Sequence, residues 1–318
     1  MPAAGNVRRG YALVVVGSTL FVINAGVSRV IQAAGVDPPL LTSVRCTGTA
    51  LVLLAVVGVR RERLSMPGSL RELAVVLGFG ITGVALVQYF YFVAIDRLPV
   101  GIALLIEFTA PVLVALFSRF VYGEQVRRRM WLGIGCSLGG LALVAQVWAG
   151  FVLDTIGVLA GVAAALSLAT YFLIGEHSVS LDPPLHVLTK AFVVAAVVWN
   201  VLAPVTGLKD VGLSSSQSLG GELASVHVPL WALMCWLIVL GTVVPFLAEL
   251  SALRYLSATE VILIGMIEPV GATILGRLWF NESLTGWQVV GIATVLLGII
   301  LAQTARQLPP TGQPVPVQ

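Results

Sequence analysis

The sequence predicts an all-α polytopic membrane protein in which ten transmembrane helices form two inverted five-helix repeats. An apolar composition, a regular series of apolar runs and an internal repeat lead to this prediction. Hydrophobic residues make up 58% of the 318 residues and charged residues 10%, whereas soluble domains carry roughly 25% charge. So few charges cannot cover the surface of a soluble protein of this size, and a lipid bilayer is the expected surrounding.

Ten apolar runs lie between polar breaks, and each approaches the ~20 residues that a helix needs to cross a bilayer. The first run follows Arg8 and Arg9 but is longer than the apolar core of a signal peptide, so we expect it to remain as a helix. The ten runs are 10–31, 38–59, 72–95, 99–121, 129–148, 154–175, 183–206, 229–253, 257–280 and 285–304.

The basic residues indicate how these helices are oriented. With the N-terminus inside, 12 of the 18 Lys and Arg residues fall on the inner side, 4 on the outer side and 2 within the runs. Membrane proteins keep an excess of Lys and Arg in their cytoplasmic loops. We therefore expect both termini to be cytoplasmic.

Two short stretches resemble each other at an offset of 145 residues. "DPPLLTSVR" begins at Asp37 and "DPPLHVLTK" at Asp182, and each ends with a cation, Arg45 or Lys190, inside an apolar run. Such a cation can extend its side chain to the nearer membrane surface, or it can point inward to a carboxylate or the substrate. The sequence leaves both alternatives open and favours the inward position for Arg45.

A longer pair of stretches resemble each other at an offset of 158 residues, beginning at Ala94 and at Ala252. The larger offset places 13 extra residues in the second half, in the polar stretch between the seventh and eighth runs. The residues 8–148 and 152–305 are therefore two repeats, followed by a short proline-rich cytoplasmic tail, 306–318. Because five helices is an odd number, the second repeat enters the membrane from the opposite side, which is typical of transporters.

At these repeated positions the sequence resembles the EamA domain family of the drug/metabolite transporter (DMT) superfamily, over nearly the whole chain. The resemblance implies a ten-helix EamA/DMT fold in a bacterial cytoplasmic (inner) membrane, with a central cavity and export of small metabolites. The phrase "EFTAPVLVALFS" is most similar to the branch of amino-acid exporters that includes threonine and homoserine efflux proteins, although the second half departs from it. The matching residues are Arg45, Lys190, Pro111, Pro269, Glu124, Glu282, Gly133 and Gly291.

Pro111 and Pro269 are expected to break their helices near the middle of the membrane. A proline leaves the carbonyl four residues earlier without its helical partner, and these carbonyls belong to Glu107 and Gly265. Free backbone groups at this depth are tolerated where they line a cavity or pack on protein. The alternative is a kink that serves packing alone.

Two carboxylates accompany these prolines. Glu107 precedes Pro111 by four residues and Glu268 precedes Pro269 by one, so both lie on a similar helix face. A charge at the bilayer centre costs ~2.5–3.5 kcal/mol and usually faces a cavity or a partner. Glu107 and Glu268 are therefore candidates for substrate binding and proton coupling, and the alternative is a structural hydrogen bond or an ion pair with Arg45.

Other polar and aromatic residues are candidates for lining the same cavity. Tyr91 and Glu249 are equivalent in the two repeats, and Trp199 lies in another span. Aromatic residues near helix ends more often anchor the protein at the membrane surface, which fits most of the tryptophans. The complete set of candidate substrate-binding residues is Glu107, Glu268, Arg45, Gln88, Tyr89, Tyr91, Glu249, Asn24 and Tyr171.

Several features point to structure alone. "SATE" from Ser257 to Glu260 matches a helix-capping box, and Glu124 and Glu282 precede a following helix, where its dipole favours a carboxylate. "GCSLG" from Gly135 has the letters of a hydrolase motif but lies inside an apolar run.

The sequence therefore predicts a secondary transporter that exports small metabolites, most of all amino acids or related compounds, by alternating access. We expect no enzyme activity, no catalytic or metal-binding residues, no cofactor and no nucleic-acid partner. The alternatives are an exporter of drugs or of sugar-like or lipid-like metabolites, or a membrane protein without a transport function. Proton coupling and facilitated diffusion both stay open, as do a monomer and a homodimer.

Overall fold

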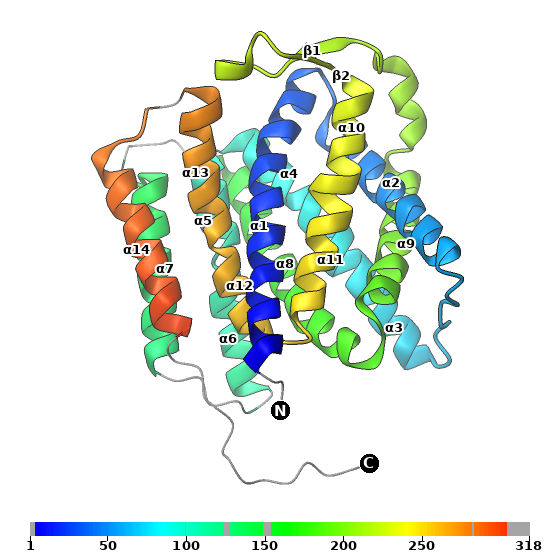
Figure 1. Cartoon of the computed structure of the whole chain (residues 1–318), viewed down its shortest axis with the longest axis horizontal. Coiled ribbons are helices and arrows are strands. Elements are labelled where there is room, and N and C mark those ends of the chain that lie inside the picture. Colours follow the sequence, from blue (N-terminus) through cyan, green and yellow to red (C-terminus); the bar gives the residue numbers. More distant parts are fainter. Residues whose placement is uncertain are drawn as a thin grey trace.

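The computed structural model describes residues 4–98, 100–121, 123, 128–148, 154–281 and 283–303. In this part of the chain ten helical segments run in alternating directions (Figure 1). The first repeat comprises α1 (Ala4–Ala33), α2 (Pro38–Val59), α3 (Leu70–Gly78) with η1 (Phe79–Leu86) and α4 (Val87–Arg97), α5 (Val100–Glu107) with α6 (Ala110–Phe120), and α7 (Arg128–Ala145). The second comprises α8 (Thr155–Leu181), α9 (Pro184–Leu202), α10 (Leu230–Ile238) with η4 (Val239–Val243) and α11 (Val244–Ala252), α12 (Ala258–Gly265) with α13 (Ile267–Phe280), and α14 (Gly286–Gln303).

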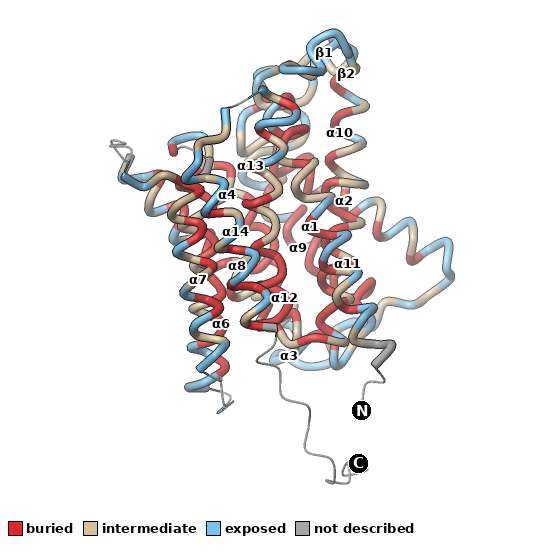
Figure 2. The backbone as a smooth tube through the Cα atoms, turned by 60° about the vertical axis from the view of Figure 1, so that its left-hand side comes forward, coloured by how far each residue is buried: buried red, intermediate tan, exposed pale blue. Residues whose placement is uncertain are grey.

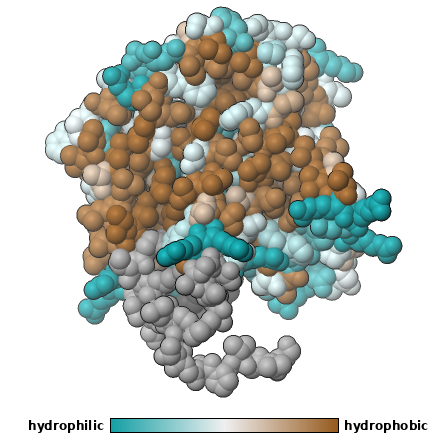
Figure 3. All heavy atoms as spheres, viewed as in Figure 1, coloured by the Kyte–Doolittle hydropathy of each residue, from teal (hydrophilic) through white to brown (hydrophobic). Residues whose placement is uncertain are grey.

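The surface of the molecule agrees with a position in a membrane. Eight of the ten segments are long and apolar enough to cross a bilayer, and α14 contains a shorter apolar helix, Gly286–Ala302. Figure 3 shows a broad hydrophobic band between two hydrophilic ends. The predicted all-helical, ten-segment membrane fold is thus confirmed. The described ends of the chain, Ala4 and Gln303, lie at the same end of the bundle, here called the N-terminal end (Figure 1).

Helix starts follow local capping chemistry. The Asp37 carboxylate accepts a hydrogen bond from the Leu40 amide at 3.0 Å, and two prolines open α2. The predicted capping box is present at α12, where Ser257 and Glu260 cap each other reciprocally. The other two carboxylates expected at helix starts, Glu124 and Glu282, lie outside the described residues, as does the tail 306–318.

The long connection between the seventh and eighth segments is folded, which the sequence did not predict. It contains η2 (Val205–Asp210), a short turn η3 (Gly221–Leu223), and the strands β1 (Ser216–Ser218) and β2 (His227–Pro229), which pair antiparallel. Trp279, near the end of α13, donates its indole N–H to the Leu219 carbonyl at 3.0 Å. This bond fixes the ribbon to α13, and the opposite end of the bundle from Ala4 is called the ribbon end.

The two repeats interlock. Helix α1 of the first repeat packs against α10, η4, α11 and α13 of the second, and α8 of the second packs against η1, α4, α5 and α6 of the first. The two second helices, α2 and α9, also pack against each other. Each first helix therefore contacts the third and fourth segments of the other repeat, and the most buried backbone lies where these segments meet (Figure 2).

The third segment of each repeat contains a π-helix at the equivalent place, η1 and η4. Gly83 in η1 and Gly241 in η4 are 158 residues apart. A Cβ added to Gly83 would lie 3.1 Å from the Tyr171 Cα, and one added to Gly241 would overlap the Asn24 side chain. The wide turn and the glycine thus let the first helix of the other repeat approach closely, and such π-bulges frequently mark functional sites.

Glycines also join the two fifth helices, α7 and α14. Gly133 lies against Gly298, and Gly140 lies against Gly291. A Cβ at Gly133 or at Gly140 would stand 2.7 Å from the carbonyl oxygen of its partner glycine. Small residues allow close backbone packing between helices in membranes, so the two glycine pairs define the contact between these helices.

Candidate functional site

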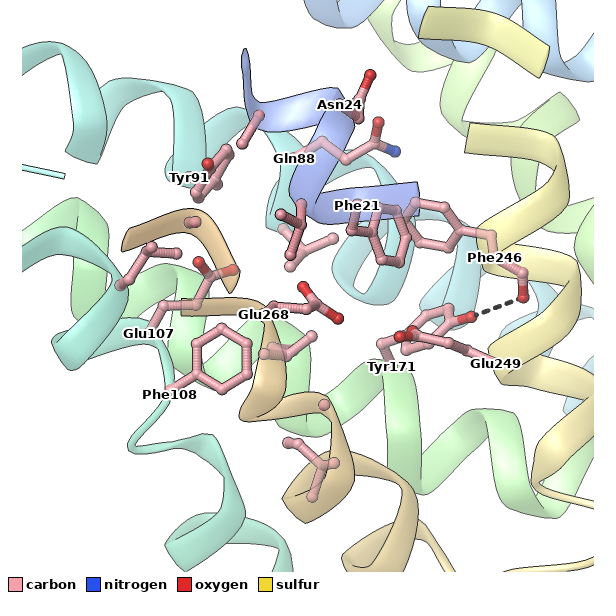
Figure 4. A pocket seen from close by; sticks show the side chains of 18 of the residues that line it. Phe21, Asn24, Gln88, Tyr91, Glu107, Phe108, Tyr171, Phe246, Glu249 and Glu268 are labelled. Carbon is pink, nitrogen blue, oxygen red and sulfur yellow. Dashed lines mark hydrogen bonds between the residues drawn. The ribbon is translucent and has the colours of Figure 1, made fainter. Parts of the chain in front are cut away.

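A cavity of about 130 Å³ lies in the middle of the bundle, where the two repeats interlock (Figure 4). Side chains from both repeats line it. The residues are Phe21, Val22, Asn24, Ala25, Ser28, Arg45, Val87, Gln88, Tyr91, Leu104, Glu107, Phe108, Leu168, Tyr171, Phe172, Phe246, Glu249, Ile262, Gly265, Glu268 and Ala272.

Breaks in the fourth segments of both repeats position two of the cavity carboxylates. Helix α5 ends at Glu107, and α6 begins at Ala110 with Pro111 as its second residue. Helix α12 ends at Gly265, and α13 begins at Ile267 with Glu268 and Pro269 in its first turn. A carboxylate in the first turn of a helix is stabilised by the helix dipole, so the break both exposes Glu268 to the cavity and stabilises its charge.

Three carboxyl groups meet in the cavity. Glu107 and Glu249 are buried and Glu268 is half-buried between them. Glu268 accepts a hydrogen bond from the Ser18 hydroxyl at 3.2 Å, and Figure 4 shows its carboxyl turned toward that of Glu249. Ionised carboxylates accept hydrogen bonds only and repel one another, so this group of carboxyls offers a place for a cation or a proton.

Arg45 supplies the positive charge of the cavity. Its side chain is buried, with its Nε donating to the Thr242 hydroxyl at 2.7 Å and its Nη2 to the Gly241 carbonyl at 3.0 Å. The guanidinium also lies 5.8 Å from the ring centre of Phe246. These partners are uncharged, so Arg45 is attached to the π-helix η4 rather than to a carboxylate. Of the two alternatives for this cation, the structure shows the inward position.

Lys190, the equivalent of Arg45 in the second repeat, lies elsewhere. Its Nζ is 2.6 Å from the Asp182 carboxylate and 3.4 Å from the Ser65 carbonyl, near the N-terminal end of the bundle. Asp182 also accepts from the Ser65 hydroxyl at 3.1 Å. The two cations therefore occupy equivalent positions in their helices but have different surroundings. Of the two, only Arg45 lines the cavity.

The remaining candidates divide into two groups. Asn24, Gln88, Tyr91 and Tyr171 all line the cavity. Tyr89 does not, because its ring packs on Trp199 at 4.8 Å between centroids. Trp199 in turn donates to the Ala85 carbonyl at 3.1 Å and is buried in the core. Both Tyr89 and Trp199 are thus packing residues in this structure, and their expected place in the cavity was wrong.

Sequence reasoning missed several residues of the site. Ser28 lines the cavity, whereas Ser18 and Thr242 contact its charged residues, Glu268 and Arg45. All three are small polar residues in apolar runs, and their contribution depends on which face of the helix they occupy. Phe246 could have been found, because it is the equivalent of Gln88 at the offset of 158. The cavity is consequently richer in aromatic side chains than the sequence indicated, with Phe21, Phe108, Phe172 and Phe246 among its walls.

An aromatic cluster lies on the N-terminal side of the cavity. Phe79 stacks on Tyr171 at 5.4 Å, and Phe246 meets Tyr171 and Phe192 edge to face, both at 5.5 Å. Beyond the cluster is a separate hollow of about 550 Å³, the N-terminal hollow, lined among others by Phe79, Asp182 and Lys190. The cluster of Phe79, Tyr171, Phe192 and Phe246 therefore stands between this hollow and the cavity.

The cavity has a different boundary toward the ribbon end. A hollow of about 520 Å³, the ribbon-side hollow, shares Ala25, Tyr91, Leu104 and Ala272 with the cavity. Because four residues line both spaces, the two adjoin. The described state is thus closed by aromatic rings on one side and adjoins a hollow on the other.

Comparison with known proteins identifies the family. The model of the EamA-like transporter family matches residues 8–146 and 155–304. The chain belongs to this family. It is accordingly a multi-pass membrane transporter built from two EamA repeats, and not an enzyme.

Its relatives include proteins from bacteria and archaea. An uncharacterized transporter of Archaeoglobus fulgidus is 27% identical over 212 residues, covering 67% of this chain and 70% of the relative. The threonine/homoserine exporter RhtA of Salmonella typhimurium is 24% identical, covering 82% and 80%. The uncharacterized inner membrane transporter YedA of Escherichia coli is 24% identical, covering 94% and 91%.

The fold is also known from a solved crystal structure. That structure superposes with a TM-score of 0.71 at 21% sequence identity and covers 95% of this chain and 99% of its own. At this identity the likeness concerns the fold.

Proposed function

We propose that this transporter exports small zwitterionic metabolites, amino acids above all, from the cytoplasm by alternating access through the central cavity. The observation that carries the proposal is that buried charges of both signs line one small space. Arg45 provides a cation attached to η4, and Glu107, Glu249 and Glu268 provide carboxyls. An α-amino acid carries one carboxylate and one ammonium group, so it matches both poles.

The size of the cavity supports a small substrate over the alternatives. Pockets for drug-sized ligands usually have volumes of ≈ 300–1,000 Å³, whereas this cavity has about 130 Å³. A drug or a lipid-like metabolite would also place apolar surface next to buried charges, which is unfavourable. A sugar-like substrate would leave the charges without counter-charges. These points favour amino acids, and the name of the relative RhtA supports export as the direction.

Alternating access has a physical basis in the arrangement of the repeats. The aromatic cluster separates the cavity from the N-terminal hollow, while the ribbon-side hollow adjoins it. In inverted-repeat transporters the two repeats exchange conformations and expose one site alternately. The N-terminal end is cytoplasmic in the predicted orientation, so the described state would release substrate outward.

The Glu249–Glu268 pair supports coupling to protons. The two carboxyls line the same small cavity and face each other in Figure 4, and the repulsion between two buried negative charges would be relieved by a proton or a cation. An arriving ammonium group and a proton would each relieve this repulsion. Substrate and proton would then compete for one site, which is the basis of exchange between them.

The first experiment is efflux of radiolabelled amino acids from cells that overproduce the transporter, with and without a protonophore. We expect faster efflux of at least one small amino acid, and slowing by the protonophore if protons drive it. Unchanged efflux for every amino acid, together with faster efflux of a drug or sugar from the same cells, would contradict the proposal and favour the alternative substrate class.

A further inference from the structure

Three buried polar atoms that line the cavity have no hydrogen-bond partner among the described residues. They are Asn24 Oδ1, Ser28 Oγ and Gln88 Oε1, and their side chains are 5%, 3% and 3% exposed. Buried polar groups in proteins almost always have a partner, and exceptions need an explanation. We propose that Asn24, Ser28 and Gln88 form a subsite for a neutral hydrogen-bonding group of the substrate, specifically a hydroxyl on a short side chain. This proposal rests on the proposed amino-acid transport.

The three residues are placed to act together. Asn24 and Ser28 are four residues apart on α1, so they lie on one face of that helix. Gln88 belongs to α4, and in the view of Figure 4 the ends of Asn24 and Gln88 point to the same side, away from Glu107, Glu268 and Glu249. All three residues line the cavity, so a substrate held there lies next to them.

The surrounding contacts fix the amide of Gln88. Its Nε2 donates to the Val84 carbonyl at 3.0 Å and contacts the Cys46 sulfur at 3.8 Å. The nitrogen is therefore already occupied by protein, and Oε1 is the atom without a partner. Asn24 is held by its close approach to Gly241, where any side chain would overlap it. Contacts with the protein therefore hold both amides before the substrate arrives, which favours selection.

Charge decides which substrate group fits. Arg45 donates to the carbonyl of Gly241, the residue against which Asn24 packs. A substrate ammonium beside this guanidinium would be repelled, and the carboxyls around Glu268 offer it a better place. A substrate carboxylate would bring no donor to the two amide oxygens. A neutral hydroxyl can donate a hydrogen bond to an amide oxygen, and it carries no charge for Arg45 to repel.

The test compares two amino acids of the same shape. Threonine and valine differ in one hydroxyl in place of a methyl group, so a subsite for a hydroxyl must distinguish them. Binding to the purified, reconstituted transporter is measured by competition with its best labelled amino acid. We expect threonine to bind at least about tenfold more tightly than valine, because a ligand without the hydroxyl leaves buried polar atoms unpaired.

Two variants assign the difference to the subsite. Gln88→Met and Ser28→Ala should each reduce the preference for threonine over valine to about twofold or threefold, because each removes a group that would bond to the hydroxyl. Gln217→Met is the control, because Gln217 lies in strand β1 and bonds to Ser215 instead of lining the cavity. It should keep the wild-type preference.

The outcomes separate this proposal from the one on which it rests. Equal binding of threonine and valine by the wild-type transporter would overturn the subsite, with water then satisfying the three atoms, and would leave amino-acid transport intact. Binding of no amino acid at all would overturn the proposed function itself. An unchanged preference for threonine in both Gln88→Met and Ser28→Ala would also overturn the assignment to these residues.

Discussion

Phe79 and Tyr171 stack with ring centroids 5.4 Å apart, and the two rings come from different repeats. Phe79 is the first residue of the π-helix η1 and lines the N-terminal hollow, whereas Tyr171 belongs to α8 and lines the cavity. The contact is therefore the boundary between the two spaces. A change of conformation that opened the cavity toward the N-terminal end would have to part these rings.

Removing the Phe79 ring should weaken this boundary. We expect Phe79→Ala to let substrate equilibrate faster across proteoliposomes and to lower the gradient that the transporter can build, because both sides of the cavity become accessible together. Phe120→Ala is the matched control, since Phe120 is 75% exposed at the end of α6. Accumulation at the wild-type level in Phe79→Ala would show that the ring does not close the cavity.

Glu107 should be required for transport and dispensable for folding. Glu107→Gln keeps the shape of a buried side chain but removes the charge that would bind a substrate ammonium. We expect uptake into inside-out vesicles to fall at least about tenfold, since hydrogen bonds to charged groups contribute ≈ 1.5–3 kcal/mol. Protein abundance in the membrane should stay near wild type.

The control for Glu107 is Glu222→Gln, a change of the same type in the exposed turn η3. It should alter neither transport nor abundance. Wild-type transport by Glu107→Gln would remove this residue from the mechanism.

Glu249 and Glu268, whose carboxyls face each other in the cavity, make a separate prediction. In Glu249→Gln and in Glu268→Gln the amide keeps the shape and polarity of the side chain, but it cannot bind or release a proton. We expect a pH gradient to stop accelerating transport, while exchange of labelled for unlabelled substrate at equal pH continues. Counterflow and gradient-driven flux in the same proteoliposomes measure the two rates. Persistent acceleration by the gradient in both variants would assign coupling to another group.

Arg45 and Lys190 offer a comparison within one chain, because they occupy equivalent positions in the two repeats. Arg45→Gln removes the cation from the cavity and breaks its bonds to Thr242 and Gly241. Lys190→Gln changes a contact with Asp182 that lies outside the cavity. We expect substrate affinity, measured by competition, to fall at least about tenfold for the first variant and less than about threefold for the second. An equal loss would mean that Lys190 also affects the site.

The same pair explains what the repeat could predict and what it could not. The repeated sequence pattern predicted the number of helices, their inversion and the helix breaks at Pro111 and Pro269, because these features depend on local chemistry. The surroundings of a side chain depend on the facing helix, and the two repeats differ there. Arg45 meets η4, whereas Lys190 meets the loop after α2.

Helical phase accounts for the error at Tyr89. Gln88 and Tyr91 are three residues apart and lie on one face of α4, whereas Tyr89 is turned by ~100° from Gln88. Ser28 lies four residues after Asn24 and therefore on the same face of α1. This spacing could have predicted from the sequence that Ser28 lines the cavity. The β-ribbon could not be found in this way, because its position depends on contacts with the distant Trp279.

The glycine pairs between α7 and α14 lead to a prediction about stability. In Gly140→Leu the new side chain would meet the Gly291 carbonyl and the backbone of Val295, which cannot move without separating the helices. Overfilling a packed contact costs ~1–3 kcal/mol, so the melting temperature in detergent should fall by several degrees. Gly139→Leu is the control, because Gly139, the residue before Gly140 on α7, faces open space. If both variants melt like the wild type, the α7–α14 contact contributes little to stability, and the glycines serve the approach of the helices in another state of the transport cycle.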